Sequence, residues 1–405
     1  MHAYDLIIAG SVAIILSYIF SEISRKTNIP SVLMLILTGI LAGLAFHTID
    51  RSLLAQPLEV LGTVGLIMIV LEGALDLELS KEKLPLIKRA TGMALIGLVG
   101  SILVIGLAIF YVFDLSIWIS LLYATPLSVI SSAIVIPSVD PLDERNKEFL
   151  IYESCISDIL GIMLFYFFIG MLDNPNKGEE IAKFSMNLVT TIVISTITSF
   201  GLIVLFKYIK SKVKIFLFLA ILIVLYAIEK QLHLSPLILI LLFGLMLKNN
   251  QLIFRGQFAN LISKMELKLM ERNFHIITRE TSFVLRTFFF IIFGLSMVLK
   301  SLLDYRALLL SIVITGFIFL VRWLLLNLFD KKNIPSLIYI APRGLITVLL
   351  YYSIPGKYES MAFPDSIILY VVIFTSIIMS VGLIKSGFTN AEPKKDLELE
   401  EGLSD

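Results

Sequence analysis

The stretch IYESCISDILGIMLFYFFIGML, residues 151–172, decides how this chain is interpreted. It is long and apolar enough to cross a lipid bilayer, yet it carries Glu153 and Asp158. An acidic side chain inside a membrane span costs free energy, so by default it marks an ion or proton pathway. In a helix, Ser154 shares the face of Asp158, whereas Glu153 and Ser157 share a different face. One helix can therefore aim a carboxylate and a hydroxyl at one target and a second carboxylate at another.

The composition of the whole chain is that of a polytopic membrane protein. Of its 405 residues, 58% are hydrophobic and only 16% are charged, which leaves too little polar surface for a large soluble protein. Apolar stretches of roughly twenty residues, the length that crosses a bilayer, recur almost end to end. We predict an all-α fold with 13 transmembrane spans, at residues 5–21, 29–47, 57–75, 89–112, 115–136, 147–172, 184–206, 213–229, 235–248, 280–300, 304–328, 334–354 and 364–388.

Several classes of function are disfavoured. A net charge of +1 argues against a nucleic-acid partner, and no P-loop or Gly-rich dinucleotide motif is present, so we expect neither ATP nor another cofactor. The lone Cys155 excludes an internal disulfide. The first apolar run follows Asp5 without a preceding basic residue, which is unlike a cleavable signal peptide.

The distribution of basic residues predicts the orientation. Of the 33 Lys and Arg residues, 23 lie in loops that follow odd-numbered spans or in the C-terminal tail, and seven lie on the opposite side. Because cytoplasmic loops are enriched in Lys and Arg, we expect an extracytoplasmic N-terminus and a cytoplasmic C-terminus. The tail, residues 389–405, is short and acidic, and we expect it to be disordered.

Two proline-interrupted spans indicate an inverted repeat. Pro126 falls in the fifth span and Pro342 in the twelfth, seven spans later, so the second copy would be inverted relative to the first. IPSVLMLILTGILAG (29–43) also resembles LSPLILILLFGLMLK (234–248). Proline frees backbone carbonyls, which is tolerated only beside protein or a wet cavity. Paired broken helices in inverted halves are the best sequence pointer to a transporter's binding site. Two ordinary proline kinks are the alternative.

Polar residues in three further spans are candidates with open roles. Thr125 precedes Pro126, where a break would expose carbonyl and hydroxyl oxygens suited to a monovalent cation, although such a hydroxyl often bonds its own helix. Arg322 either extends to the membrane surface or pairs with Glu153. Arg343 follows the second proline and could offset a half-helix end or repel cations.

Glu72 and Arg286 complete the set of charged candidates. Glu72 either lines a cavity or lies at the end of its helix, and Arg286 could equally be an interface anchor. The segment 249–279 contains QFANLISKMELKLMERNF, which predicts a basic amphipathic helix that either links spans or lies on the cytoplasmic membrane surface.

These residues also carry a family resemblance, which extends over nearly all 13 spans. The chain resembles monovalent cation–proton antiporters of the sodium–proton exchanger type. ESCISD (153–158) resembles the family's Glu-Ser-x-x-Asn-Asp signature, Thr125-Pro126 its Ala-Thr-Asp-Pro break, LEGAL (71–75) its third-span motif and PRG (342–344) its twelfth-span segment. Two positions depart from the pattern: Ser157 replaces an asparagine, and the aspartate of Thr-Asp-Pro is missing.

The resemblance implies a site and a mechanism. Asp158 would bind cation and proton alternately, with Ser154, Thr125 and Ser157 around the cation, while Glu153 and Arg322 would form a structural ion pair. A single aspartate implies electroneutral one-for-one exchange. Na⁺ is the expected cation; K⁺ exchange is the alternative, with Li⁺ undecided.

The resemblance also implies an architecture of two inverted repeats, 5–172 and 213–388, joined by a linking span at 184–206. Spans 4–6 and 11–13 would form a moving core, and spans 1–3 and 8–10 a panel that pairs in a homodimer. We expect elevator-type alternating access in a bacterial inner membrane, contacts with lipids, and a role in pH homeostasis.

Three other functions are alternatives to exchange. A sodium-coupled symporter of the same architecture would need an organic substrate to transport with sodium. A cation channel would need a continuous polar pore, and the sequence contains no repeated carbonyl filter loop that would line one. An intramembrane hydrolase would need Asp158 and Glu153 to act together, yet they point apart on their helix. We therefore do not expect an enzyme.

Overall fold

The computed structural model describes residues 3–27, 29–45, 55–139, 142–174, 176–209, 214–231, 236–253, 263–296, 304–329, 337–360 and 363–385. Throughout these ranges the regular structure is helical, without a strand. Eight spans there are long and apolar enough to cross a membrane, and two shorter apolar helices accompany them. The expected all-α membrane fold is confirmed. The tail at 389–405, predicted to be disordered, lies outside the described residues.

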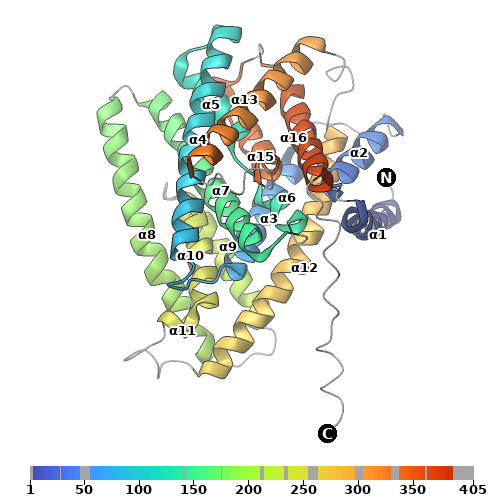
Figure 1. Ribbon diagram of the computed structural model, residues 1–405. Helices are drawn as coiled ribbons and strands as arrows, with labels where there is room; N and C mark the ends of the chain where they lie inside the picture. Colours follow the sequence, from blue (N-terminus) through green and yellow to red (C-terminus); the bar gives the residue numbers. More distant parts are fainter. Residues whose placement is uncertain are drawn as a thin grey trace.

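The helices follow one another along the chain in the order shown in Figure 1. They are α1 (Ala3–Thr27), α2 (Ser31–Ala45), α3 (Ala55–Asp76), α4 (Leu84–Phe113), α5 (Ile117–Ser128), α6 (Ser132–Ser138), α7 (Glu144–Asp173), α8 (Lys177–Tyr208), α9 (Lys214–Gln231), α10 (Pro236–Lys248), α11 (Asn250–Ile253), α12 (Lys264–Ser296), α13 (Tyr305–Phe329), α15 (Leu345–Tyr352) and α16 (Ser366–Lys385).

The apolar stretch 151–172, which carries Glu153 and Asp158, lies in α7, a helix of 30 residues. Asp143 caps its N-terminus, because the side chain accepts a hydrogen bond from the backbone N–H of Asn146. Leucine, isoleucine, methionine and phenylalanine fill most of the rest, and both carboxylates are buried, Glu153 at 1% exposure and Asp158 at 0%. The helix therefore carries two acids through the middle of the fold.

The fifth span is broken, but not where the sequence indicated. We expected the break at Thr125–Pro126, whereas α5 runs through both residues to Ser128, and α6 begins at Ser132. Val129 and Ser131 have extended backbone, so residues 129–131 separate the two half-helices. Proline alone does not end a helix where it stands: the interruption falls where backbone groups find partners elsewhere in the fold.

The twelfth span is interrupted as well. Residues 340–344 are not helical, and α15 begins at Leu345; at the start of the predicted span 334–354, residues 334–336 lie outside the described residues. The two interruptions meet, because the N–H of Ser131 donates to the carbonyl of Pro342 at 2.9 Å. Gly344 permits this approach, since a Cβ there would lie 2.7 Å from the Ser131 hydroxyl. The crossed, broken helices of an inverted-repeat fold are thus present.

On one side of the molecule, α1 and α2 lie against α12 (Figure 1). The crossing of α2 and α12 depends on two glycines. A Cβ on Gly39 would lie 2.1 Å from the carbonyl oxygen of Ile291, and one on Gly294 would lie 2.2 Å from that of Ile36. Only glycine allows two helix backbones to approach so closely, as small residues do in other membrane proteins.

The amphipathic helix expected within 249–279 is not a separate element. Residues 264–279 are continuous with the tenth span in the single helix α12, while residues 254–262 lie outside the described part of the chain. One face of this extension is buried through Leu267, Met270 and Phe274. The extension therefore packs one face against the protein, which agrees better with the linking role than with a helix on the membrane surface.

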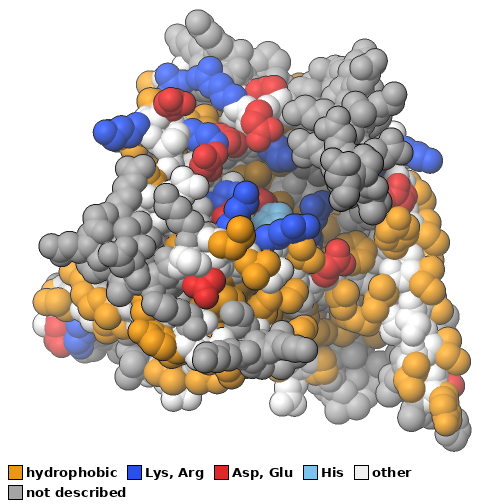
Figure 2. All heavy atoms as spheres, turned by 90° about the horizontal axis from the view of Figure 1, so that it is seen from below, with side chains coloured by type: hydrophobic (Ala, Val, Ile, Leu, Met, Phe, Trp, Pro, Cys, Tyr) orange, Lys and Arg blue, Asp and Glu red, His pale blue; other side chains and the backbone are white. Residues whose placement is uncertain are grey.

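The connection between α3 and α4 is held at both ends. The side chain of Asn249, at the end of α10, donates to the carbonyl of Leu77 at 3.0 Å and accepts from the N–H of Leu79 at 2.6 Å. At the other end, Lys83 forms an ion pair of 2.5 Å with Glu148 of α7. Figure 2 views this end of the molecule, where basic and acidic side chains and a histidine gather on one face.

Candidate functional site

Asp158 is fully buried beside the interruption of the fifth span. Its Oδ2 accepts two hydrogen bonds from Ser132, one from the backbone N–H at 3.3 Å and a short one from the hydroxyl. Its Oδ1 is buried and accepts no hydrogen bond from the described residues. No Lys, Arg or His of the described chain forms an ion pair with it. Among the described residues, Asp158 therefore has neutral hydrogen-bond donors on one carboxylate oxygen and no donor on the other.

The backbone groups released by the break are almost fully accounted for. The N–H groups of three consecutive residues leave the helix pattern: Ile130 donates to the Ser157 hydroxyl at 3.1 Å, Ser131 to Pro342, and Ser132 to Asp158. A buried backbone donor without a partner is costly, so these acceptors determine where the helix opens. Asp158 and Ser157 are thus part of what holds the interruption in place.

Arg343 takes the freed carbonyl groups. Its Nε donates to Leu127 at 2.9 Å, Nη2 to Ser128 at 3.1 Å and Nη1 to Ala341 at 2.9 Å, and the side chain is buried. Leu127 and Ser128 are the last residues of α5, where the helix dipole is negative, so a guanidinium there is favourable. Of the two roles considered for Arg343, the geometry matches compensation of a half-helix end.

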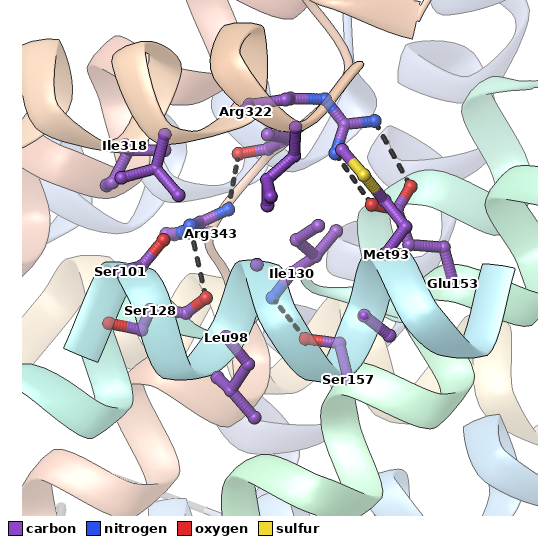
Figure 3. Close-up of a pocket in the computed structure, with 15 residues that line it drawn as sticks. Met93, Leu98, Ser101, Ser128, Ile130, Glu153, Ser157, Ile318, Arg322 and Arg343 are labelled. Carbon is purple, nitrogen blue, oxygen red and sulfur yellow. Dashed lines mark hydrogen bonds and ion pairs between the residues drawn. The ribbon is translucent and has the colours of Figure 1, made fainter. Parts of the chain in front are cut away.

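Glu153 and Arg322 are in contact through two parallel hydrogen bonds. Nη1 of Arg322 lies 2.8 Å from one carboxylate oxygen of Glu153 and Nη2 lies 3.1 Å from the other (Figure 3). Nε of Arg322 donates to the carbonyl of Leu337 at 2.8 Å. Their side chains are 1% and 4% exposed. Arg322 therefore does not extend to the membrane surface; its charge is balanced inside the protein.

The remaining predicted ligands are oriented less simply. The hydroxyls of Ser154 and Thr125 donate to carbonyls of their own helices, at Ile151 and Leu121, with distances of 3.2 and 2.8 Å. Ser157 uses its oxygen to accept from Ile130. Pro126 lies inside α5, and Pro342 lies at the crossing. None of the three hydroxyls has a hydrogen bond to Asp158; the residue that does is Ser132.

Ser132 was missed as a site residue by sequence reasoning. It was one of several hydroxyl residues in the fifth span, and Pro126 drew attention to a position six residues earlier. A signal was available in SVISSA (128–133), where two adjacent serines follow β-branched residues that favour extended backbone. Such a run is a better marker of the opened segment than the proline.

Glu72 and Arg286 face each other across α3 and α12. Nη2 of Arg286 lies 3.8 Å from Glu72, and its Nη1 donates to the carbonyl of Ala133 in α6 at 3.4 Å. Both side chains are largely buried, at 6% and 11% exposure. Arg286 thus reaches the residue next to Ser132, rather than serving as an anchor at the membrane surface.

A small cavity lies on the Glu153 side of the crossing (Figure 3). Its polar lining comes from Ser101, Ser128, Ser157, Glu153, Arg322 and Arg343, and Asp158 is not part of it. Among the described residues, no group of three or more His, Cys, Asp or Glu side chains could hold a metal ion. The carboxylates of the site, Glu153 and Asp158, thus belong to no such group.

An all-helical membrane protein in which two interrupted helices cross beside a buried carboxylate has the architecture of a secondary transporter. Residues 11–385 match the family described as "Sodium/hydrogen exchanger, transmembrane". The chain belongs to this family, so it is a cation/proton antiporter and not an enzyme.

Solved structures agree on the fold. The sodium proton antiporter MjNhaP1 from Methanocaldococcus jannaschii, determined at pH 8, superposes with a TM-score of 0.75 and 18% identity, over 96% of this chain and 100% of that one. An electron-microscopy structure of MjNhaP1 gives a TM-score of 0.70 and 20% identity, over 97% and 100%. At such identities the likeness shows a shared fold. No curated protein matches the chain.

Proposed function

We propose that this protein exchanges Na⁺ for H⁺ at Asp158, one ion for one proton. The observation that carries the proposal is the state of this carboxylate: it is completely buried, one oxygen has no partner, and no basic side chain of the described residues balances its charge. A bare charge in such a place is unfavourable, so the carboxylate favours an occupant. Na⁺ and H⁺ each neutralise it, and each excludes the other.

The one-for-one ratio follows from the second carboxylate of α7. Glu153 is held by both terminal nitrogens of Arg322, so its charge is already balanced. Of the two carboxylates of α7, this leaves Asp158 to exchange one positive charge for another. The absence of an aspartate after Thr125 points in the same direction, because it removes the other acid that the family motif would bring to the break.

Alternating exposure is proposed to come from an elevator-type movement. The interruption at 129–131, the Pro342 segment, Arg343 and α7 are joined to one another by hydrogen bonds, so they would move as a unit. This unit would slide against a panel formed by α1, α2, α3, α9, α10 and α12, and two such panels would pair in a homodimer. The apolar outer side chains of α1, among them Ile7, Ile8 and Ile15, are exposed and fit either lipid or a partner copy.

The experiment is proton flux in proteoliposomes that carry a preset pH gradient. Addition of NaCl to the wild type should collapse the gradient, and Asp158→Asn should behave like vesicles without protein. A variant that still exchanged Na⁺ for protons would refute Asp158 as the carrier. Measured charge movement across the membrane during exchange would refute the one-for-one ratio.

K⁺ is the second candidate cation. Ser157 stands where the family signature has asparagine, and its oxygen accepts from the N–H of Ile130. The surroundings of Asp158 therefore differ from the family pattern at this residue and at the missing aspartate of Thr-Asp-Pro. Parallel additions of NaCl, LiCl and KCl to the same vesicles separate the candidates. Na⁺ should give the lowest half-saturating concentration, and a lower value for K⁺ would reverse the assignment.

The orientation of the protein and the membrane that contains it are proposed as well. With 23 of 33 basic residues on one side, the C-terminus would be cytoplasmic in a bacterial inner membrane, where sodium–proton exchange would contribute to pH homeostasis.

A further inference from the structure

We propose that Ser132 is a positioning residue that assigns separate tasks to the two oxygens of Asp158. Oδ2 is held by Ser132, and Oδ1 receives the cation or the proton. By holding the carboxylate in its charged form, Ser132 biases the competition toward the cation. This inference rests on the proposed role of Asp158 as the carrier.

The geometry separates the two oxygens clearly. Both polar groups of Ser132, the hydroxyl and the backbone N–H, reach Oδ2, whereas Oδ1 is buried and receives no hydrogen bond from the described residues. An ionised carboxyl group can accept about four hydrogen bonds, so the free capacity lies on Oδ1. A cation that displaced the Ser132 donors would leave them unsatisfied, whereas a cation at Oδ1 leaves them in place.

Ser132 is held in this position by its neighbours. The N–H of Ser131 is fixed on Pro342, and the N–H of Ile130 is fixed on the Ser157 hydroxyl, one residue before Asp158. Gly344 closes the crossing so tightly that a Cβ would meet Ser131. The donors are therefore preorganised, and the carboxylate does not have to arrange them when an ion leaves.

The bias toward the cation follows from linkage. Hydrogen bonds to a carboxylate favour its ionised form over its protonated form. The cation-bound state keeps the ionised carboxylate, while the proton-bound state loses it. Two donors on Oδ2 therefore stabilise the cation-bound state more than the proton-bound state, even though they touch neither ion.

The chain offers a matched control in the neighbouring residue. The hydroxyl of Ser131 is buried like that of Ser132, at 1% exposure for each residue, but it has no hydrogen-bond partner among the described residues. Its connection to the crossing runs through the backbone, which substitution by alanine leaves unchanged. Ser131→Ala and Ser132→Ala thus remove the same atom one residue apart, and only the second removal touches Asp158.

The test measures Na⁺-driven proton flux as a function of Na⁺ concentration and pH. Ser132→Ala should raise the half-saturating Na⁺ concentration about tenfold, the scale of one lost hydrogen bond to a charged group. It should also shift the pH profile to alkaline values by about one unit, since protons then compete better. The maximal rate at saturating Na⁺ should remain. Ser132→Thr, which keeps the hydroxyl, should restore the wild-type profile, and Ser131→Ala should match it.

The outcomes separate this inference from the proposed function. An active Asp158→Asn would overturn the carrier, whereas an inactive Asp158→Asn with Ser132→Ala indistinguishable from Ser131→Ala would overturn the role of Ser132 alone. A loss of maximal rate without a pH shift would make Ser132 merely structural, and would also contradict the inference. If Ser132→Ala does not fold, Ser132→Cys, with a weaker donor of similar size, should shift the profile in the same direction by a smaller amount, and an unshifted profile would again count against it.

Discussion

The two carboxylates of α7 lie five residues apart in one helix and are equally buried, yet their surroundings are opposite. Glu153 faces a guanidinium that satisfies both of its oxygens. Asp158 faces a serine that satisfies one of its oxygens and leaves the other free. The same chemical group thus serves as a structural ion pair at one position and as a candidate ion carrier at the other. What differs is whether a fixed positive charge is within reach.

Burial does not by itself identify a transport residue. The charge of a buried acid that is bound by both terminal nitrogens of an arginine is neutralised, and removing either partner destabilises the fold. The charge of a buried acid without a basic side chain beside it is not neutralised by the protein, so an ion or a proton can bind there. Removing that charge should abolish exchange. Function and stability should therefore separate between two residues of a single helix.

The largest expected effect is a complete loss of exchange without a loss of stability. Asp158→Asn removes the charge but keeps an oxygen that can accept from Ser132. We expect no Na⁺-driven proton flux, with a melting temperature in detergent equal to or above that of the wild type, because an unbalanced buried charge is gone. A melting temperature several degrees lower would mean that Asp158 is structural, and the contrast with Glu153 would disappear.

The next effect falls on stability. Glu153→Ala strands Arg322 in a buried position, and we expect a loss of about 3–5 kcal/mol of folding free energy. Chemical unfolding in detergent measures it. Combining Glu153→Ala with Arg322→Ala should recover part of the loss, because the second change removes the stranded charge. If the double variant is no better folded than either single variant, the two residues are not coupled.

A smaller effect is expected for Glu72, whose carboxylate lies 3.8 Å from Arg286 without a hydrogen bond between them. Arg286 keeps its contact with the Ala133 carbonyl after the change. Glu72→Gln should therefore cost about 1 kcal/mol, measured by the same unfolding assay. A loss as large as that of Glu153→Ala would show that distance and bidentate geometry do not govern these pairs.

The smallest effect concerns His275 and Asp76, a pair at 2.8 Å with about a third of each side chain exposed. His275 lies in the part of α12 that precedes the predicted span at 280–300. The hydrogen bond to Asp76 raises the pKa of His275 above its usual value of 6.5, against the opposing effects of burial, Lys248 and Arg279. The pair thus stabilises the fold below that value, and the stabilisation is lost as the pH rises through the raised pKa.

His275→Gln should therefore lower the melting temperature at pH 5.5 more than at pH 8.5. The difference should correspond to a few tenths of a kcal/mol, because solvent screens an exposed pair. Lys248→Gln provides the control, since it removes a nearby positive charge that opposes protonation of His275 and should strengthen the pH dependence. An equal loss at both pH values for His275→Gln would show that the ring contributes by packing alone.

Much of the fold was predictable because bilayer thickness imposes its own length scale on the sequence. The apolar stretches were sufficient for an all-helical membrane protein. The sequence also placed Glu153 and Asp158 on different faces of one helix, which is a consequence of helical periodicity alone. Such features depend on local spacing.

What could not be predicted depends on partners that are distant in sequence. The position of the break follows from Ser157, Asp158 and Pro342, each of which accepts a backbone N–H of residues 130–132. Pro126, the local signal, remains inside a helix. The choice between two roles for Arg322 likewise needed the location of α13 beside α7. Hydrogen bonds between residues that are distant in sequence make Ser132, and not Thr125, the hydrogen-bond partner of Asp158.

The anchored connection between α3 and α4 has a mechanical consequence. Asn249 holds Leu77 and Leu79 to the end of α10, and Lys83 is clamped to Glu148 on α7. Tyr152 of α7 also donates to the carbonyl of Glu78, between the two residues that Asn249 holds. A displacement of α7 relative to α10 would therefore strain all of these bonds at once. In the proposed elevator movement they would have to open and form again in every cycle, so this connection would act as a latch between α7 and α10 and not as a loose loop.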